Sequence, residues 1–155
     1  MKTLKPVTKS SRQMTRIEYK KVLSGHKPTK SLLKGKRSTG GRNSFGRITT
    51  RHHGGGHKRK YRAVDFTFDK QNIEATIKSI EYDPNRSAFI GLAVYRDGEK
   101  RYVVLPKSMK VDDVFIVSET APLKPGNRLP LGKMPVGTFV YNVSIQPGMK
   151  AAIAR

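Results

Sequence analysis

Three histidines, His52, His53 and His57, have the spacing in this sequence that most resembles a metal or catalytic site. A zinc site needs three or four ligands held rigidly, usually with carboxylate or thiolate help. Here three glycines separate His53 from His57, cations flank them, and no acidic residue occurs between Glu18 and Asp65. We therefore predict that these imidazoles stack on bases or donate to phosphates, and that they hold no metal ion.

The glycine-rich strings do not match a nucleotide-binding loop. Gly35-Lys36 is followed by Arg37 where that motif requires Ser or Thr, and Lys30 stands where its first Gly belongs. The run at 54–56 is not followed by Lys-Ser or Lys-Thr either, although its backbone N–H groups suit an anion-binding concavity. These glycines therefore predict an anion-binding loop that has no catalytic function.

Acidic side chains are equally unpromising as catalysts. Asp97 and Glu99 flank a turn glycine, and Asp112-Asp113 precedes a short apolar run, so both pairs are typical of solvated turns. A nucleophile also needs a positioned base, but every His lies within residues 26–57. We predict that the chain is not an enzyme and has no cofactor and no small-molecule substrate.

The positive charge is concentrated in the first part of the chain. Of 155 residues, 32 are Lys or Arg and 11 are Asp or Glu, a net charge of +21. Residues 1–62 hold 19 of the basic residues and only one acidic residue, a net of +18, whereas residues 63–155 carry a net of +3. This pattern predicts a cationic arm on a nearly neutral body, with only the body able to bury a core.

Arginine, glycine and aromatic residues from 35 to 62 favour RNA as the acidic partner. Arg donates forked hydrogen bonds to phosphate and stacks on bases, and Phe45 and Tyr61 lie among the cations. No helix here could fill the major groove of DNA. Such a segment cannot bury enough apolar surface to order itself, so we expect it to be disordered alone and to fold on RNA.

Composition excludes several other classes. The absence of Cys rules out disulfides, thiolate zinc sites and iron–sulfur clusters. No apolar run approaches the ~20 residues of a membrane span, and residues 1–20 lack the apolar core of a secretory signal. An organellar transit peptide is disfavoured because Lys outnumbers Arg and the basic character continues to residue 62. Residues 35–62 also lack the amphipathic stripe of a membrane-binding helix, so we expect no membrane partner.

The body shows the alternation of short strands. A helical turn or two is possible only within 12–23, and the apolar phase slips after Ile77, which indicates a β-bulge. The stretch 87–96 is apolar on both faces, as a central strand is, and Gly91 marks a bend or close contact. Asp97-Gly98 predicts a two-residue hairpin turn. We expect a turn at 83–86 and strands at 62–68, 73–82, 87–96, 100–106, 111–117 and 138–145.

Six short strands with frequent turns predict a mainly β protein built as a small antiparallel barrel. A five-stranded OB-fold fits residues 63–120 best, and an SH3-like barrel is the rival.

Several long strings resemble the family of the universal large-subunit ribosomal protein number two. The stretch 38–58 (STGGRNSFGRITTRHHGGGHK) carries the resemblance most clearly. It continues in Tyr61-Arg62, Asp65-Phe66, 80–88 (IEYDPNRSA), 97–102 (DGEKRY) and 124–127 (KPGN), and 4–8 (LKPVT) resembles the bacterial-type start. The resemblance spans essentially the whole sequence, and the start suggests that nothing precedes the mature N-terminus.

The resemblance implies a non-enzymatic rRNA-binding protein of the large ribosomal subunit that supports subunit assembly and translation. It divides the chain into a basic extension (1–62), an OB-fold-like barrel (63–126) and the first part of an SH3-like barrel (127–155). The implied rRNA contacts are Arg42, Asn43, Arg47, Arg51, His52, His53, Gly54, Gly55, Gly56, His57, Lys58, Arg59, Lys60, Tyr61, Arg62, Asn85 and Arg86.

The implied partners are large-subunit rRNA and other ribosomal proteins, and any structural Mg²⁺ would belong to the rRNA. Family members of bacterial type are longer than this chain, so one hypothesis is that a separate chain carries the C-terminal half, and another is that the rest is simply missing. The implied location is the large subunit, in the bacterial cytoplasm or in the mitochondrial or plastid matrix. The alternative function is a free-standing OB-fold binder or chaperone of single-stranded RNA, which would stack bases on Tyr82, Tyr95 or Tyr102.

Overall fold

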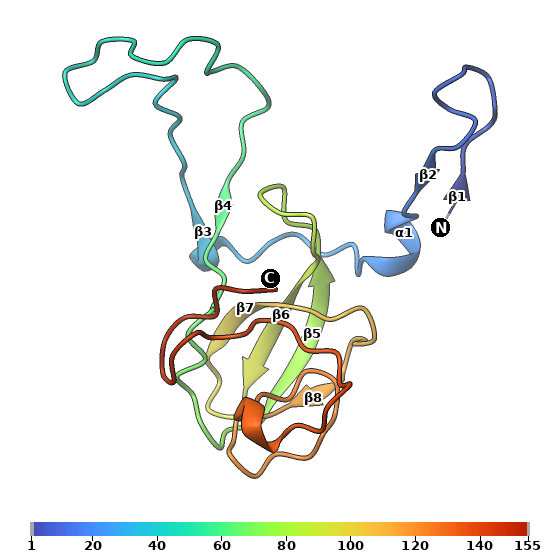
Figure 1. The fold of residues 1–155 in the computed structure, drawn as a ribbon, viewed down its shortest axis with the longest axis vertical. Helices are drawn as coiled ribbons and strands as arrows, with labels where there is room; N and C mark the ends of the chain where they lie inside the picture. The colour runs from blue at the N-terminus through green and yellow to red at the C-terminus, as the bar shows by residue number, and fades with distance from the viewer. Residues whose placement is uncertain (1, 155) are drawn as a thin grey trace.

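A four-stranded antiparallel sheet forms the body of the protein. The structure is a computed structural model and describes residues 2–154. The sheet has the order β7-β6-β5-β8 and curls into a half-barrel (Figure 1). Its strands are β5 (Ala75–Glu81), β6 (Ile90–Tyr95), β7 (Lys100–Val104) and β8 (Val114–Phe115). The prediction of a mainly β, OB-fold-like body is confirmed.

Two short ribbons precede this sheet. β1 (Lys2–Thr3) pairs with β2 (Thr15–Arg16), and β3 (Leu33–Lys34) pairs with β4 (Tyr61–Arg62). The helical segments are single turns: α1 (Tyr19–Val22), η1 (Lys30–Leu32) and η2 (Leu131–Lys133). No helix within residues 2–154 has both the length and the apolar character needed to cross a membrane.

The pairing of β5 with β6 confirms the predicted bulge. The register shifts between Ile77 and Ser79, so the side chains of Ser79, Ile80 and Glu81 are all buried. β6 lies between two strands, as predicted for a central strand. The predicted close contact is also present, because a Cβ on Gly91 would lie 2.8 Å from Leu105 Cδ1.

The hairpin between β6 and β7 has a different turn from the one predicted. The Gly98 N–H donates to the Tyr95 carbonyl and the Tyr95 N–H donates to the Glu99 carbonyl, each at 2.9 Å. Gly98 has a φ of +86°, whereas Arg96 and Asp97 have no positive φ. A two-residue I′ turn needs positive φ at both central residues. The loop is therefore a three-residue turn with a glycine bulge.

Three predicted strands are shortened or absent. The prediction for 62–68 is wrong beyond Val64, because Asp65 Oδ1 accepts the N–H groups of Thr67 and Phe68 and turns the chain. The stretch 111–117 contains the two residues of β8 and an isolated bridge from Val117 to Arg128. The stretch 138–145 forms no strand and has a single bridge, from Val143 to Ile153. Alternation alone does not supply a partner strand, and Phe139 within it is fully exposed.

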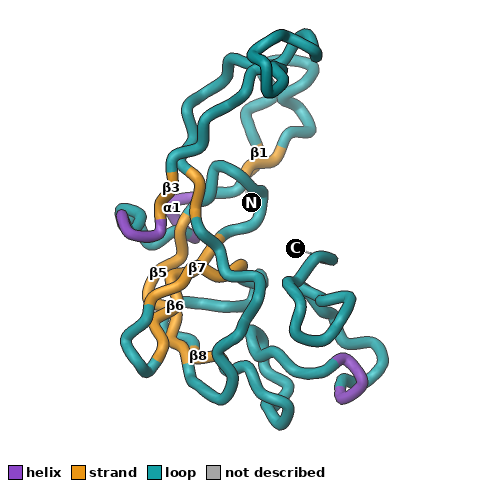
Figure 2. Tube along the Cα trace, turned by 90° about the vertical axis from the view of Figure 1, so that its left-hand side faces the viewer, coloured by secondary structure: helices purple, strands orange, loops and turns teal. Residues whose placement is uncertain are grey.

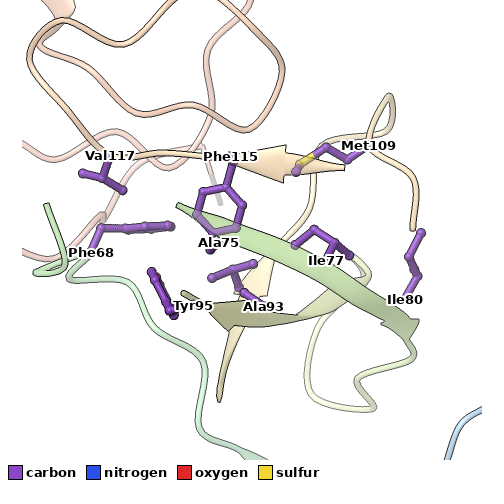
Figure 3. Close-up of a cluster of buried hydrophobic side chains, with 10 residues drawn as sticks. Phe68, Ala75, Ile77, Ile80, Ala93, Tyr95, Met109, Phe115 and Val117 are labelled. Carbon is purple, nitrogen blue, oxygen red and sulfur yellow. The ribbon is translucent and has the colours of Figure 1, made fainter. Parts of the chain in front are cut away.

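The core lies between the sheet and the loops that cross its concave face (Figure 3). Phe115 meets Tyr95 edge to face with ring centroids 6.3 Å apart. Tyr95 and Tyr102 are both buried, and burial raises the pKa of Tyr95 to about 12. Neither ring is available to stack on a base. The cluster consists of Phe68, Ala75, Ile77, Ile80, Ala93, Tyr95, Val103, Met109, Phe115 and Val117.

Part of the basic N-terminal segment packs on the barrel, which the sequence analysis missed. The Tyr19 ring meets Tyr82 and Phe89 edge to face, at 5.5 and 6.0 Å between centroids. Ser24 exchanges two hydrogen bonds with Ile80: its N–H donates to the carbonyl, and its Oγ accepts the N–H. These contacts fix the chain that leads into β3.

A second attachment runs through buried polar groups. The Thr29 N–H donates to the Tyr102 hydroxyl at 2.9 Å, and that hydroxyl donates to Glu81 Oε2 at 2.7 Å. Glu81 Oε1 accepts from Ser79 Oγ at 3.0 Å. Burial raises the pKa of Tyr102 most, and the hydrogen bond to Glu81 is the second cause. The Tyr102 hydroxyl therefore keeps its proton and acts as a donor. Every member of this chain is satisfied, so it ties the arm to the sheet without an orphan group.

One end of the barrel carries a network of ion pairs. Arg101 contacts Asp65 (2.8 Å), Glu99 (2.7 Å) and Asp69. Lys70 contacts Asp97 and Glu99. Asp97 and Glu99 are thus half-exposed members of a cation-bridged cluster. Hydrogen bonds from Lys70 lower the pKa of Asp97, and those from Arg101 and Lys70 lower the pKa of Glu99.

This network predicts an acid-sensitive stability. The carboxylates have folded pKa values below their ordinary 3.8 and 4.5, so folding is favoured above those values and the contribution is lost as the pH falls through the folded pKa. Urea unfolding from pH 6 to pH 3 should show the free energy of unfolding falling below about pH 4.5. In Arg101→Gln the fall should be shallower, and an equal slope in both proteins would contradict the assignment.

Candidate nucleic-acid interface

The most extended feature of the molecule is the loop between β3 and β4, which we call the cationic loop (residues 35–60). The pairs Leu33↔Arg62 and Lys34↔Tyr61 close its base. From there it projects away from the barrel, as both views show (Figures 1 and 2). Every residue from 42 to 60 is exposed. The loop therefore offers its side chains to a partner on all sides.

Within residues 2–154 the cations of this loop have no acidic partner. The loop contains eight Lys and Arg and no Asp or Glu. None of the ion pairs formed within residues 2–154 involves any of them. Among the described residues, Arg59 is the only one of these cations with a side-chain hydrogen bond, to the Pro84 carbonyl at 3.0 Å. The cations are Lys36, Arg37, Arg42, Arg47, Arg51, Lys58, Arg59 and Lys60.

The far part of the loop is a small hairpin, which we call the tip hairpin (residues 41–50). Arg42 and Ile48 form a bridge, and the N–H groups of Thr49 and Thr50 both donate to the Gly41 carbonyl. Asn43 Oδ1 accepts the N–H groups of Phe45 and Arg47, each at 3.0 Å. These hydrogen bonds hold Arg42 and Arg47 in a defined turn of the loop.

Gly41 is required by this geometry. It has a φ of +76°, and a Cβ there would collide with the Thr50 carbonyl oxygen. We expect Gly41→Ala to disrupt the tip hairpin and to weaken RNA binding about tenfold, because the loop would lose its preorganisation. Gly46→Ala, where no atom lies within 4 Å of the added Cβ, strains the backbone without a collision and should have a smaller effect. Filter binding checks both, and an equal loss would contradict the collision as the cause.

The histidines and glycines of residues 52–57 are all exposed and follow the tip hairpin in the chain. Gly54, Gly55 and Gly56 all have positive φ, as does His52 at +59°. His57 Nδ1 lies 3.0 Å from the Lys58 carbonyl oxygen, so its ring is turned toward its own backbone. Within residues 2–154 no three His, Cys, Asp or Glu side chains gather as a metal site would require.

The predicted contacts Asn85 and Arg86 lie at the base of the loop. Their turn forms as predicted around Asp83, whose fully buried carboxylate accepts from Arg86 Nε at 2.6 Å and from Asn85. Asn85 Nδ2 also donates to the Lys60 carbonyl at 3.0 Å. This turn therefore braces the base of the cationic loop, and RNA contact by Asn85 and Arg86 remains a prediction.

Tyr61 and Arg62, in β4, are half-buried. The predicted contacts therefore lie on one loop and at its braced base, where Tyr61, Arg62, Asn85 and Arg86 are found. The brace itself, which Asp83 and Lys60 supply, was not predicted from the sequence. A carboxylate followed by Pro-Asn-Arg in a turn was the available signal, since Asp accepts hydrogen bonds from the residues after it.

A half-barrel that carries an extended loop rich in cations has the electrostatic features of an RNA-binding domain. Comparison with protein families specifies the class further. Residues 29–117 match the family described as Ribosomal Proteins L2, RNA binding N-terminal domain. The match covers more than half of the sequence, and the chain belongs to this family. It is a structural RNA-binding protein of the ribosome and not an enzyme, as predicted.

Proposed function

We propose that this protein is a structural constituent of the large ribosomal subunit and binds large-subunit rRNA through the cationic loop. The observation that carries the proposal is the set of eight loop cations on an exposed segment, none of which has an acidic partner in the part of the chain that the structure describes. Phosphates are the natural counter-charges for such a segment, and each contact releases condensed cations from the RNA. By ordering rRNA segments around itself, the loop would support subunit assembly and translation.

The geometry supports two different modes of RNA contact along the loop. Arg42, Asn43 and Arg47 lie on the preformed tip hairpin, where guanidinium groups can donate forked hydrogen bonds to phosphates. The stretch 51–60 has no such framework and would take its shape from the RNA. The N–H groups of Gly54–Gly56 would then lie close to the sugar-phosphate backbone of the RNA. Contacts by Tyr61, Arg62, Asn85 and Arg86 would occur where the loop meets the barrel. No protein-bound cofactor is needed, and Mg²⁺ would belong to the rRNA.

Other ribosomal proteins would complete the surroundings of the chain. We propose that residues 1–62 act as the RNA-binding extension, that 63–126 form the barrel, and that 127–155 contribute to an SH3-like unit. Val136, Phe139 and Ile145 are exposed apolar residues in this last region, which supports contact with further protein, including a separate chain that carries a C-terminal half. The chain would be located in the compartment that contains this ribosome, which is the bacterial cytoplasm or the mitochondrial or plastid matrix.

Sedimentation of a native extract through a sucrose gradient tests this proposal. After a high-salt wash the protein should remain with the large subunit and stay with it when the subunits dissociate. A protein that runs free and leaves RNA at moderate salt would contradict the proposal and favour the free-standing single-strand binder.

A further inference from the structure

Phe45 is an unusual residue for its surroundings. Its side chain is 86% exposed at the end of the tip hairpin. Within residues 2–154 its ring has no aromatic partner and no cation above it. The nearest acidic residues in the sequence are Glu18 and Asp65, whereas Arg42 and Arg47 lie three and two positions from Phe45. A large apolar ring thus stands in water among cations.

The backbone beneath this ring is well defined. The Gly46 N–H donates to the Asn43 carbonyl at 3.0 Å, and the Asn43 N–H donates to the Arg47 carbonyl at 2.9 Å. These two backbone hydrogen bonds repeat the pattern of the Tyr95–Glu99 turn of the barrel, including the glycine with positive φ. The Asn43 side chain adds two further hydrogen bonds, from the N–H groups of Phe45 and Arg47. Phe45 therefore projects from a fixed turn, and only its side-chain torsions need to be ordered on binding.

The positive charge near the Phe45 ring indicates which kind of partner it contacts. An apolar protein surface would gain nothing from the guanidinium groups of Arg42 and Arg47 on the same hairpin. An unpaired nucleotide matches both features, since its base has a flat π face and its phosphates are anionic. We propose that Phe45 is a base-stacking residue: its ring stacks on an unpaired base of rRNA, and Arg42 and Arg47 contact the adjacent phosphates.

This inference rests on the proposed function of the loop, and binding measurements separate the two. The probe is a large-subunit rRNA transcript refolded with Mg²⁺, compared with a fully paired RNA duplex. Phe45→Ala should weaken binding to the transcript about 5- to 150-fold, the range expected for one stacked base. Phe45→Tyr should retain affinity, and Ile48→Ala, an exposed aliphatic residue of the same hairpin, should change it less than about twofold. On the duplex all four proteins should bind alike.

The salt dependence provides an independent readout. Phe45 makes no phosphate contact, so Phe45→Ala should keep the wild-type slope of log K against log salt. Arg47→Gln should reduce that slope by about 0.7–0.9. Equal affinities of wild type and Phe45→Ala for the transcript would overturn the stacking proposal. A steep salt slope of the wild-type protein would still support the proposed function in that case. An equal loss on the duplex would also overturn the stacking proposal. A wild-type protein without a steep slope would overturn the proposed function itself.

Fluorescence reports on the ring directly, because the sequence contains no Trp. Phe45→Trp places a single reporter on the hairpin, and Phe139→Trp places one at a fully exposed site in 127–154, outside the loop. Emission from the first should be quenched by the transcript in step with binding, and emission from the second should change much less. Equal responses at both sites would argue against stacking.

Discussion

Replacing residues 35–60 with the dipeptide Asn-Gly removes RNA binding while the barrel remains folded. The paired residues Lys34 and Tyr61 are suitably placed for a two-residue hairpin turn, so the β3–β4 ribbon can close directly. Eight cations leave with the loop. We expect the slope of log K against log salt to fall by about 5 to 7 and the affinity for an rRNA transcript at 0.15 M salt to fall on the order of a thousandfold.

A matched variant keeps the loop but removes its charge. With all eight Lys and Arg changed to Gln, the length and the glycines are retained, and RNA binding should be lost to a similar extent. The thermal midpoint of both variants should stay within a few degrees of that of wild type, because the core lies outside the loop. Retained affinity in the Asn-Gly variant would show that the barrel, and not the loop, is the RNA-binding element.

The largest effect on stability is expected for Phe115→Ala. Phe115 is 3% exposed, packs against Tyr95, and lies opposite Ala75 in the pairing of β8 with β5. Removing a buried Phe costs about 3–5 kcal/mol, through lost transfer energy and the cavity left behind. That is a large fraction of the stability of a small domain. Chemical denaturation followed by circular dichroism measures the change.

Phe139→Ala is the matched control for this substitution. Its ring is fully exposed, so the same chemical change should alter the free energy of unfolding by less than about 0.5 kcal/mol. A comparable loss in both variants would mean that residue 139 is packed in solution. A small loss in Phe115→Ala would mean that β8 contributes little to the core.

The sequence predicted the central part of the sheet because its signals are local. The slip of the apolar phase after Ile77 marked the bulge, and the apolar run around Gly91 marked the central strand. The stretch 138–145 has an equally clear alternation but no strand to pair with, and the pattern contains no information about partners. The stretch 62–68 failed for another reason: the Asp65 carboxylate captures two backbone N–H groups and ends the extended conformation.

The sequence indicated the basic segment but not the form that it takes in the structure. Charge counting located the loop, because unpaired cations are visible in the sequence itself. The tip hairpin was missed, although Asn43 with Gly46 three positions later is typical of a type I turn. The attachment of Ser24 and Thr29 to the barrel could not have been predicted, since it uses isolated hydrogen bonds and a buried Glu81 that resembles any other strand residue.

The closed base of the cationic loop has a topological consequence. A free terminal tail can thread through a gap in folded RNA one strand at a time, but a loop pinned at Lys34 and Tyr61 has no free end to pass through. It enters only through an opening wide enough for two strands at once, about 10 Å with strands spaced roughly 4.8 Å apart, or RNA helices close around it afterwards. Where the RNA has closed to a gap narrower than the two strands, release of the protein requires the RNA to reopen.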